Sequence, residues 1–254
     1  MNSRDSLAHG VAPAPARTLH ARSLTGAIRV PPVPGRTVRF GRESRPEADL
    51  CICRDDLRVS RRHGELTYRQ GQWWLRNIGQ QLVRLPQGRL MHVSTDPVPL
   101  PAGYTPVFVR GSGFREHLVE LYVSDEDGAG PDARRSAETL PPKRWPLDDE
   151  ERLILVVLGQ RYLLYEPDPR PLSYRQAAEA LSFLCGERWS EKKVQHRVED
   201  VRRRLNPGFP YELLESERGE QSDNSLKHNL LKGLVESTTL VPPDLALLDD
   251  EFDD

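Results

Sequence analysis

Phe40-Gly41-Arg42 ends one short β-like run of this chain, and Val59-Ser60-Arg61-Arg62-His63 fills the loop that precedes a later one. A guanidinium just after a glycine at a strand end, with a hydroxyl and further arginines in a tight loop, supplies the donors of a small anion site. A phosphorylated side chain suits such a cluster because it carries close to two negative charges and three acceptor oxygens. The two stretches therefore predict a β-rich domain whose loops bind an anion.

Short β-type runs separated by Gly, Pro and Asp fill residues 24–123. No convincing amphipathic helix interrupts them, so this spacing predicts an all-β sandwich over residues 23–124. Residues 1–22 are rich in Ala, Pro, Arg and Ser without periodicity, and we expect a disordered tail there. The predicted strands are 27–30, 37–40, 50–53, 64–69, 73–77, 82–85, 107–110 and 118–123.

The hydrophobic period changes in the second half of the chain. Residues 125–144 have the composition of a linker, and apolar residues at helical spacing then predict a mostly α domain over 145–240. We expect its helices at 147–165, after the cap Ser173 up to Gly186, after the cap Ser190 up to Leu205, and from about 224 to 237. A predicted strand at 209–215 makes the domain resemble a winged helix. Residues 241–254 are predicted to form an extended acidic tail.

Charge is unevenly distributed along the 254 residues, although the net charge is only −2. Residues 23–124 contain 15 arginines, no lysine and 9 acidic residues, whereas residues 221–254 carry 2 basic and 8 acidic side chains. Arginine suits phosphate and carboxylate better than lysine does, because its planar fork donates two parallel hydrogen bonds. Codon bias toward arginine is the alternative explanation. The acidic tail also allows a third interpretation, in which it folds back onto the basic sandwich.

The β-rich half resembles the forkhead-associated (FHA) domain, a β-sandwich that binds phosphothreonine peptides. The resemblance covers about residues 24–123 and implies that Arg42 contacts the phosphate or the peptide backbone, as the arginine of the family's Gly-Arg pair does. It implies that Ser60 donates a hydrogen bond to the phosphate and that Arg61 faces the peptide. Gly41 and His63 are implied to be structural, with His63 bracing the loop.

The following strand and turn continue the resemblance and then depart from it. Residues 73–79 match the family pattern W-x-L-x-D/N-x-G, but Leu82 and Val83 stand where the family has Asn and Gly. A leucine cannot form the hydrogen bonds by which that amide clamps the peptide backbone, and losing two such bonds costs on the order of 1–3 kcal/mol. We expect phosphate capture by the arginines and Ser60 to remain, with Arg84 supplying replacement contacts. A sandwich that serves only as a scaffold is the alternative.

The third predicted helix of the second domain carries basic residues on its solvent side, and Lys192, Lys193 and Arg197 are its candidate DNA contacts. Acidic residues lie among them and the domain is nearly neutral, so protein contact or a purely solvated face are the alternatives. The chain contains no HExxH, GxSxG or GxxxxGK motif and no metal-ligand spacing. We therefore expect that the protein is not an enzyme and that it has neither a metal site nor a cofactor.

The sequence as a whole predicts a two-domain regulatory protein that binds a phosphorylated protein in Ser/Thr-kinase signalling. Its alternative is a DNA-binding transcriptional regulator with a degenerate FHA scaffold. The arginine-rich composition and the length resemble actinobacterial FHA proteins. With 37% hydrophobic residues, a mean hydropathy of −0.61 and three cysteines without a disulfide framework, we expect a cytoplasmic chain that does not engage a membrane.

Overall fold

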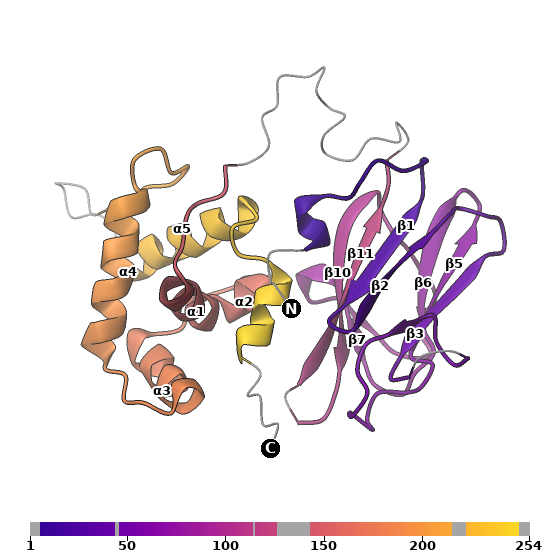
Figure 1. Ribbon diagram of the computed structural model, residues 1–254, viewed down its shortest axis with the longest axis horizontal. Helices are drawn as coiled ribbons and strands as arrows, with labels where there is room; N and C mark the ends of the chain where they lie inside the picture. Colours follow the sequence, from indigo (N-terminus) through magenta and orange to yellow (C-terminus); the bar gives the residue numbers. More distant parts are fainter. Residues whose placement is uncertain (1–5, 44–45, 114, 126–142, 215–221, 249–254) are drawn as a thin grey trace. The chain divides into compact units, whose positions relative to one another are not determined.

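The computed structural model describes the chain apart from residues 1–5, 44–45, 114, 126–142, 215–221 and 249–254. The chain divides into two compact units, Met1–Pro141 and Pro142–Asp254. Their boundary falls within 125–144, the range predicted as a linker. The first unit is built from β-strands and the second from helices, as Figure 1 shows.

Two β-sheets form the first unit (Figure 1). The six-stranded sheet has the order β2-β1-β11-β10-β7-β8 and the five-stranded sheet the order β4-β3-β5-β6-β9. The first sheet contains β1 (Leu19–Ser23), β2 (Gly26–Val30), β7 (Val83–Arg84), β8 (Leu90–Met91), β10 (Gly103–Arg110) and β11 (Glu116–Val123). The second contains β3 (Thr37–Gly41), β4 (Leu50–Cys51), β5 (Gly64–Arg69), β6 (Gln72–Asn77) and β9 (Val98–Pro99). β3 and β4 run parallel, whereas the central pairs β3–β5, β5–β6 and β10–β11 are antiparallel.

Alternating side chains of both sheets form one hydrophobic core. Leu66 and Leu75 from the second sheet and Val107 and Val119 from the first are all fully buried, as is Trp73. Burial of each such side chain contributes about 1.5–3 kcal/mol to stability. The predicted β-sandwich is confirmed.

The structure differs from the expectation of a disordered tail over residues 1–22. Leu7–His9 form a 3-10 helix capped by Ser6, and β1 lies between β2 and β11 with Leu19 opposite Val123. Leu19 and Ala21 are buried in the core, so their period-two alternation forms the strand despite the Ala- and Pro-rich composition before it. Residues 1–5 lie outside the described part.

The helices of the second unit begin at the predicted capping residues in two cases. α3 (Tyr174–Cys185) has a capping box from Ser173 and ends at Gly186, whose φ of 64° is left-handed. α4 (Glu191–Leu205) begins after Ser190, which accepts a hydrogen bond from the Lys193 amide. α4 contributes an apolar stripe to a second core: Val194, Val198, Val201 and Leu205. The second domain is thus helical, as predicted.

The first predicted helix is in fact two, α1 (Asp149–Leu158) and α2 (Gln160–Leu163), separated at Gly159. A Cβ on Gly159 would lie 2.8 Å from the side chain of Leu231, so glycine permits the close approach of α5 (Asp223–Glu236). The C-terminal segment also differs from an extended tail: Pro242–Leu248 form a 3-10 helix in which buried Asp244 pairs with Arg152 at 3.0 Å. The tail residues 249–254 lie outside the described part.

The predicted strand at 209–215, the wing of a winged helix, is absent from its described residues 209–214. Side chains satisfy the backbone there, because Asn206 accepts from the Leu213 amide and Asn229 donates to the Glu212 carbonyl. The Phe209 ring packs on Trp145 with centroids 5.0 Å apart. No described helix in either unit has both the length and the apolar character needed to cross a bilayer.

Candidate functional site

Arg42 leaves the end of β3 and is held against the loop that precedes β5. Its amide donates to the Ser60 carbonyl at 3.0 Å, and its Nε donates to the Val59 carbonyl at 3.3 Å. The guanidinium is mostly buried, with 16% of the side chain exposed. At Gly41 an added Cβ would lie 2.0 Å from the Arg61 carbonyl oxygen, so the strand and the loop meet only because this residue is glycine.

His63 connects this loop to the one that follows β6. The Ser60 amide donates to its Nδ1 at 3.1 Å, so the proton resides on Nε2, which donates to the Gln81 carbonyl at 3.0 Å. Complete burial lowers the pKa of His63, and the ring is therefore neutral at neutral pH. The ring occupies a position that fixes both loops at once.

The turn after β6 presents a backbone donor to the serine. Asn77 accepts from the Gly79 amide at 2.9 Å and donates to the carbonyls of Gln81 and Met91, which shapes the turn. The Gln80 amide then donates to Ser60 Oγ at 3.3 Å. No sequence pattern points to Gln80, because its contribution comes from the backbone and not from the side chain.

Carboxylates of the same chain pair with the arginines of these loops. Arg61, with 63% of its side chain exposed, pairs with Glu43 at 3.1 Å, and Arg42 pairs with the same carboxylate at 3.0 Å. Arg62, which is 53% exposed, pairs with Glu47 at 2.9 Å. The structure thus brings Arg42, Ser60 and Arg61 into one loop cluster, the arrangement in which a phosphate would meet two guanidiniums and a hydroxyl.

Asp56 anchors the loop that carries Ser60, a role that its sequence position in a polar turn did not reveal. Its fully buried carboxylate accepts from the Ser112 amide and hydroxyl at 2.8 and 2.7 Å, and from the Arg58 amide at 3.0 Å. The His117 ring lies at 2.9 Å. Burial opposes ionisation, but these hydrogen bonds outweigh it and hold the pKa of Asp56 well below its usual range.

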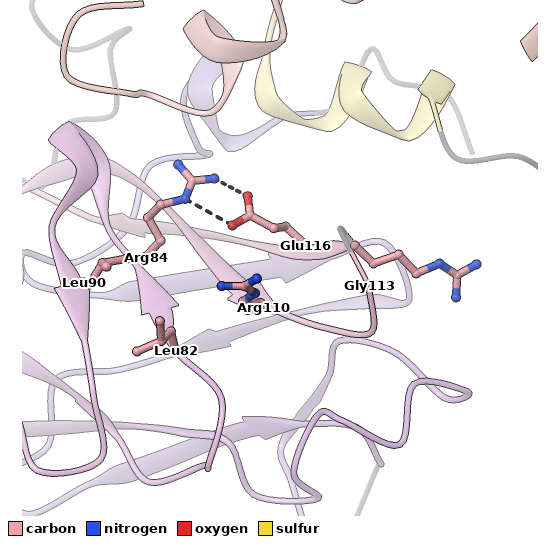
Figure 2. Close-up of a pocket in the computed structure, with 7 residues that line it drawn as sticks. Leu82, Arg84, Leu90, Arg110, Gly113 and Glu116 are labelled. Atoms are coloured by element: carbon pink, nitrogen blue, oxygen red, sulfur yellow. Dashed lines mark hydrogen bonds and ion pairs between the residues drawn. The ribbon is translucent and has the colours of Figure 1, made fainter. Parts of the chain in front are cut away.

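Arg84, the residue expected to supply replacement contacts, forms an ion pair within the six-stranded sheet. Its guanidinium makes a two-bond ion pair with Glu116 (Figure 2). It also stacks over the Phe108 ring at 4.5 Å, and 14% of the side chain is exposed. It lines a pocket of about 270 Å³ whose walls include Leu82 and Arg110. The Nε and Nη2 edge of the Arg84 guanidinium is therefore already paired with Glu116, and contact between Arg84 and a phosphopeptide remains a prediction.

The candidate DNA contacts lie on α4 of the second unit. Lys192 and Lys193 are both exposed, and the Lys193 ammonium lies 3.5 Å from the centroid of the Trp189 ring. Arg197 pairs with Glu150 at 2.6 Å and Asp148 at 3.4 Å, and the hydrogen bond that its Nε donates to Glu150 raises the pKa of Arg197. Through these pairs Arg197 links α4 to the start of α1. DNA binding by Lys192, Lys193 and Arg197 remains a prediction.

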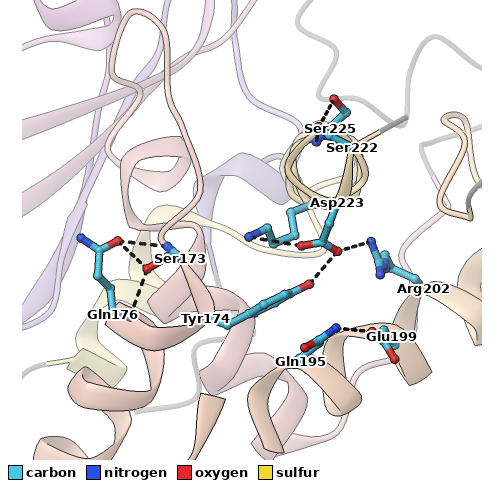
Figure 3. A network of polar contacts seen from close by, with 10 residues as sticks. Ser173, Tyr174, Gln176, Gln195, Glu199, Arg202, Ser222, Asp223 and Ser225 are labelled. Atoms are coloured by element: carbon cyan, nitrogen blue, oxygen red, sulfur yellow. Dashed lines mark hydrogen bonds and ion pairs between the residues drawn. The ribbon is translucent and has the colours of Figure 1, made fainter. Parts of the chain in front are cut away.

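A polar network joins three helices of the second unit (Figure 3). Asp223, the first residue of α5, accepts from the Tyr174 hydroxyl of α3 and from Arg202 of α4, both at 3.0 Å. Buried Lys227 lies 3.5 Å from the same carboxylate and 4.1 Å from the Tyr174 centroid. The contacts give this cluster a structural role.

Residues 38–104 match the family model of the FHA domain. They form an FHA domain. The match contains β3, the loop with Ser60 and His63, and the turn with Gln80. Among solved structures, FHA-1 of Mycobacterium tuberculosis Rv1747 is similar, with 20% identity over 43% of this chain and 98% of its own, at a TM-score of 0.33.

Two other solved structures extend the comparison. The FHA domain of human APLF, in complex with an XRCC1 bisphospho peptide, is 19% identical over 41% of this chain and 97% of its own, at a TM-score of 0.30. The yeast Dun1 FHA domain, in complex with a doubly phosphorylated peptide from Rad53, is 11% identical over 55% of this chain and 92% of its own, at a TM-score of 0.30. No curated protein matches the chain.

Proposed function

We propose that the first unit binds a phosphorylated protein at the loop cluster of Arg42, Ser60 and Arg61, and that the chain is an adaptor in Ser/Thr-kinase signalling. The observation that carries the proposal is the convergence of these three side chains at one end of an FHA domain, fixed by buried His63. FHA domains are phosphopeptide-binding modules. The role proposed is therefore one of binding and not of catalysis.

The geometry explains how a phosphate would be held. The Nε of Arg42 donates to the Val59 carbonyl at 3.3 Å, which orients the guanidinium. Nη1 of Arg42 donates to Glu43, the carboxylate that also pairs with Arg61. Ser60 Oγ accepts one hydrogen bond from the Gln80 amide, which leaves its own hydroxyl proton to donate. Two charge-assisted contacts and one hydroxyl therefore converge on an anion that enters from solvent.

Recognition of the ligand residues next to the phosphate differs from the family pattern, because Leu82 has no side-chain amide. Leu82 instead forms a wall of the pocket that also contains Arg110 and Arg115 (Figure 2). We expect the affinity to depend mainly on the phosphate and only weakly on backbone clamping. Dissociation constants in the micromolar range would follow from such a site.

Fluorescence polarisation with a degenerate phosphothreonine peptide library and its unphosphorylated counterpart tests the proposal on the full chain. Arg42→Ala and Ser60→Ala should each weaken phosphate-dependent binding by about tenfold or more, since a hydrogen bond to a charged group contributes about 1.5–3 kcal/mol. Arg62→Ala is the matched control in the same loop, because its exposed pair with Glu47 lies apart from the cluster. Equal losses for Arg42→Ala and Arg62→Ala would contradict the proposed site.

A further inference from the structure

The Glu43 carboxylate lies between the two arginines of the proposed phosphate site. A single oxygen, Oε1, accepts from Nη1 of Arg42 at 3.0 Å and from Nε of Arg61 at 3.1 Å. These are the two guanidiniums assigned above to the phosphate, and Glu43 bridges them. With 40% of its side chain exposed, Glu43 has solvent into which it can move.

A phosphate and the Glu43 carboxylate compete for the same donors. Nη1 of Arg42 and Nε of Arg61 each point one N–H at Oε1, and a phosphate oxygen placed between the two arginines would take over those N–H groups. A phosphate that arrived while Glu43 stayed in place would also meet a like charge at short range. A phosphate placed between the two guanidiniums therefore displaces the Glu43 carboxylate.

We propose that Glu43 is an internal competitor that sets the affinity threshold of the phosphate site. The inference rests on the proposed function, since it concerns the same arginines. In the unliganded protein Glu43 occupies Arg42 and Arg61, and it lowers the affinity for every anion by the same factor. A ligand then binds at ordinary concentrations only if its contacts with the arginines are more favourable than the contacts of Glu43 that it displaces.

Phosphate meets this condition and a carboxylate does not. A phosphothreonine has about two negative charges and three acceptor oxygens, enough for Arg42, Arg61 and the Ser60 hydroxyl together. A glutamate of a ligand would merely replace one carboxylate by another, with no added charge to offset the entropy lost on association. The bridge thus makes the site unresponsive to ordinary acidic peptides.

The opposite role for Glu43 makes an opposite prediction. If the carboxylate served to hold the two arginines in a productive geometry, its neutralisation would weaken phosphate binding. If it competes, Glu43→Gln should tighten binding of the phosphothreonine library by about three- to tenfold, the factor expected for two partly exposed ion pairs. The sign of the change therefore separates the two roles.

Glu47→Gln is the matched control. It removes the same charge from the same segment, but Glu47 pairs with Arg62, which is not part of the cluster. We would measure the full-chain wild type, Glu43→Gln, Glu43→Ala and Glu47→Gln by fluorescence polarisation. The probes are the phosphothreonine library, the same library with glutamate at the phosphothreonine position, and the unphosphorylated library.

Tighter binding of the phosphothreonine library by both Glu43 variants, with Glu47→Gln within about twofold of wild type, supports the inference. Phosphate-dependent binding that is unchanged or weaker in both Glu43 variants overturns it and leaves the proposed function intact. Absence of phosphate-dependent binding in the wild type and in both Glu43 variants overturns the proposed function and this inference with it.

Discussion

Replacement of Asp56 by alanine should strongly destabilise the first unit, because it removes a buried carboxylate with four hydrogen-bonding partners. The partners are the Ser112 amide and hydroxyl, the Arg58 amide and the His117 ring, at distances of 2.7–3.0 Å. Loss of the acceptor leaves buried donors unpaired at the turn between β10 and β11. Disruption of a buried charged group of this kind costs about 3–5 kcal/mol, which is a large part of the 5–15 kcal/mol typical of a domain's stability.

Asp55→Ala is the matched control, since Asp55 is adjacent in sequence but 74% exposed and pairs with Arg115 only at 3.4 Å. Its removal should change stability by less than about 0.5 kcal/mol. Urea unfolding of the full chain, followed through the NMR signals of the buried Val107 and Val119 amides, reports on the first unit separately. A loss in Asp56→Ala no larger than that in Asp55→Ala would refute the reasoning.

The pH dependence gives a second readout of the same carboxylate. Because the folded-state pKa of Asp56 lies below the unfolded value of 3.8, its contribution is complete above that value and is lost as the pH falls toward the folded pKa. The stability difference between wild type and Asp56→Ala should therefore be constant from about pH 5 to 7 and should narrow below about pH 4. A difference that grew on acidification would contradict the account.

Two further substitutions test buried contacts of the first unit. Glu120 accepts hydrogen bonds from Ser6 and from the Tyr104 hydroxyl, and burial raises its pKa. The ionised form therefore disfavours folding once the pH exceeds the unfolded pKa of 4.5, so Glu120→Gln should raise the Tm measured by calorimetry at pH 7, and this gain should fade toward pH 4. A lower Tm of Glu120→Gln at pH 7 would contradict the claim that the ionised carboxylate destabilises the fold. Gly79→Ala should lower the free energy of unfolding by about 1–3 kcal/mol, because the new Cβ would lie 2.7 Å from the His63 ring. Gly26→Ala, which has open space around the new Cβ, should leave the free energy of unfolding nearly unchanged. Equal effects of the two substitutions would show that the turn at Gly79 accommodates a Cβ.

The sequence predicts the central strands of the sandwich well, since period-two alternation and turn residues bound them. Residues 64–69 were predicted as a strand and form β5 with the same ends. β1 escapes prediction because the Ala/Pro-rich segment before it dominates the composition, although Leu19 is wholly buried. β8 and β9 have two residues each, too few to show a period. The prediction of a strand at 209–215 was wrong, because in the described residues 209–214 the β-prone side chains pack on helices and have no strand partner.

The candidate site is predictable only as far as side chains carry the signal. Arg42, Ser60, Arg61 and His63 stand out in the sequence and come together in the structure. Gln80 contributes a backbone amide, which any residue but proline would supply. Asp56 resembles an ordinary turn residue until the fold brings Ser112 and His117 to it, and Glu43 becomes significant only when two arginines converge on it. These relations depend on tertiary contacts and leave no local pattern.

The most direct test of phosphate recognition is an NMR titration of the full chain with the degenerate phosphothreonine library and its unphosphorylated counterpart. The account predicts phosphate-dependent shifts of the amides of Arg42, Ser60 and Gln80 and of the Arg42 and Arg61 side-chain Nε–H groups. It predicts no matching change around Lys192 on α4. Shifts confined to α4, or identical shifts with the unphosphorylated library, would contradict the assignment of the loop cluster as a phosphate-binding site.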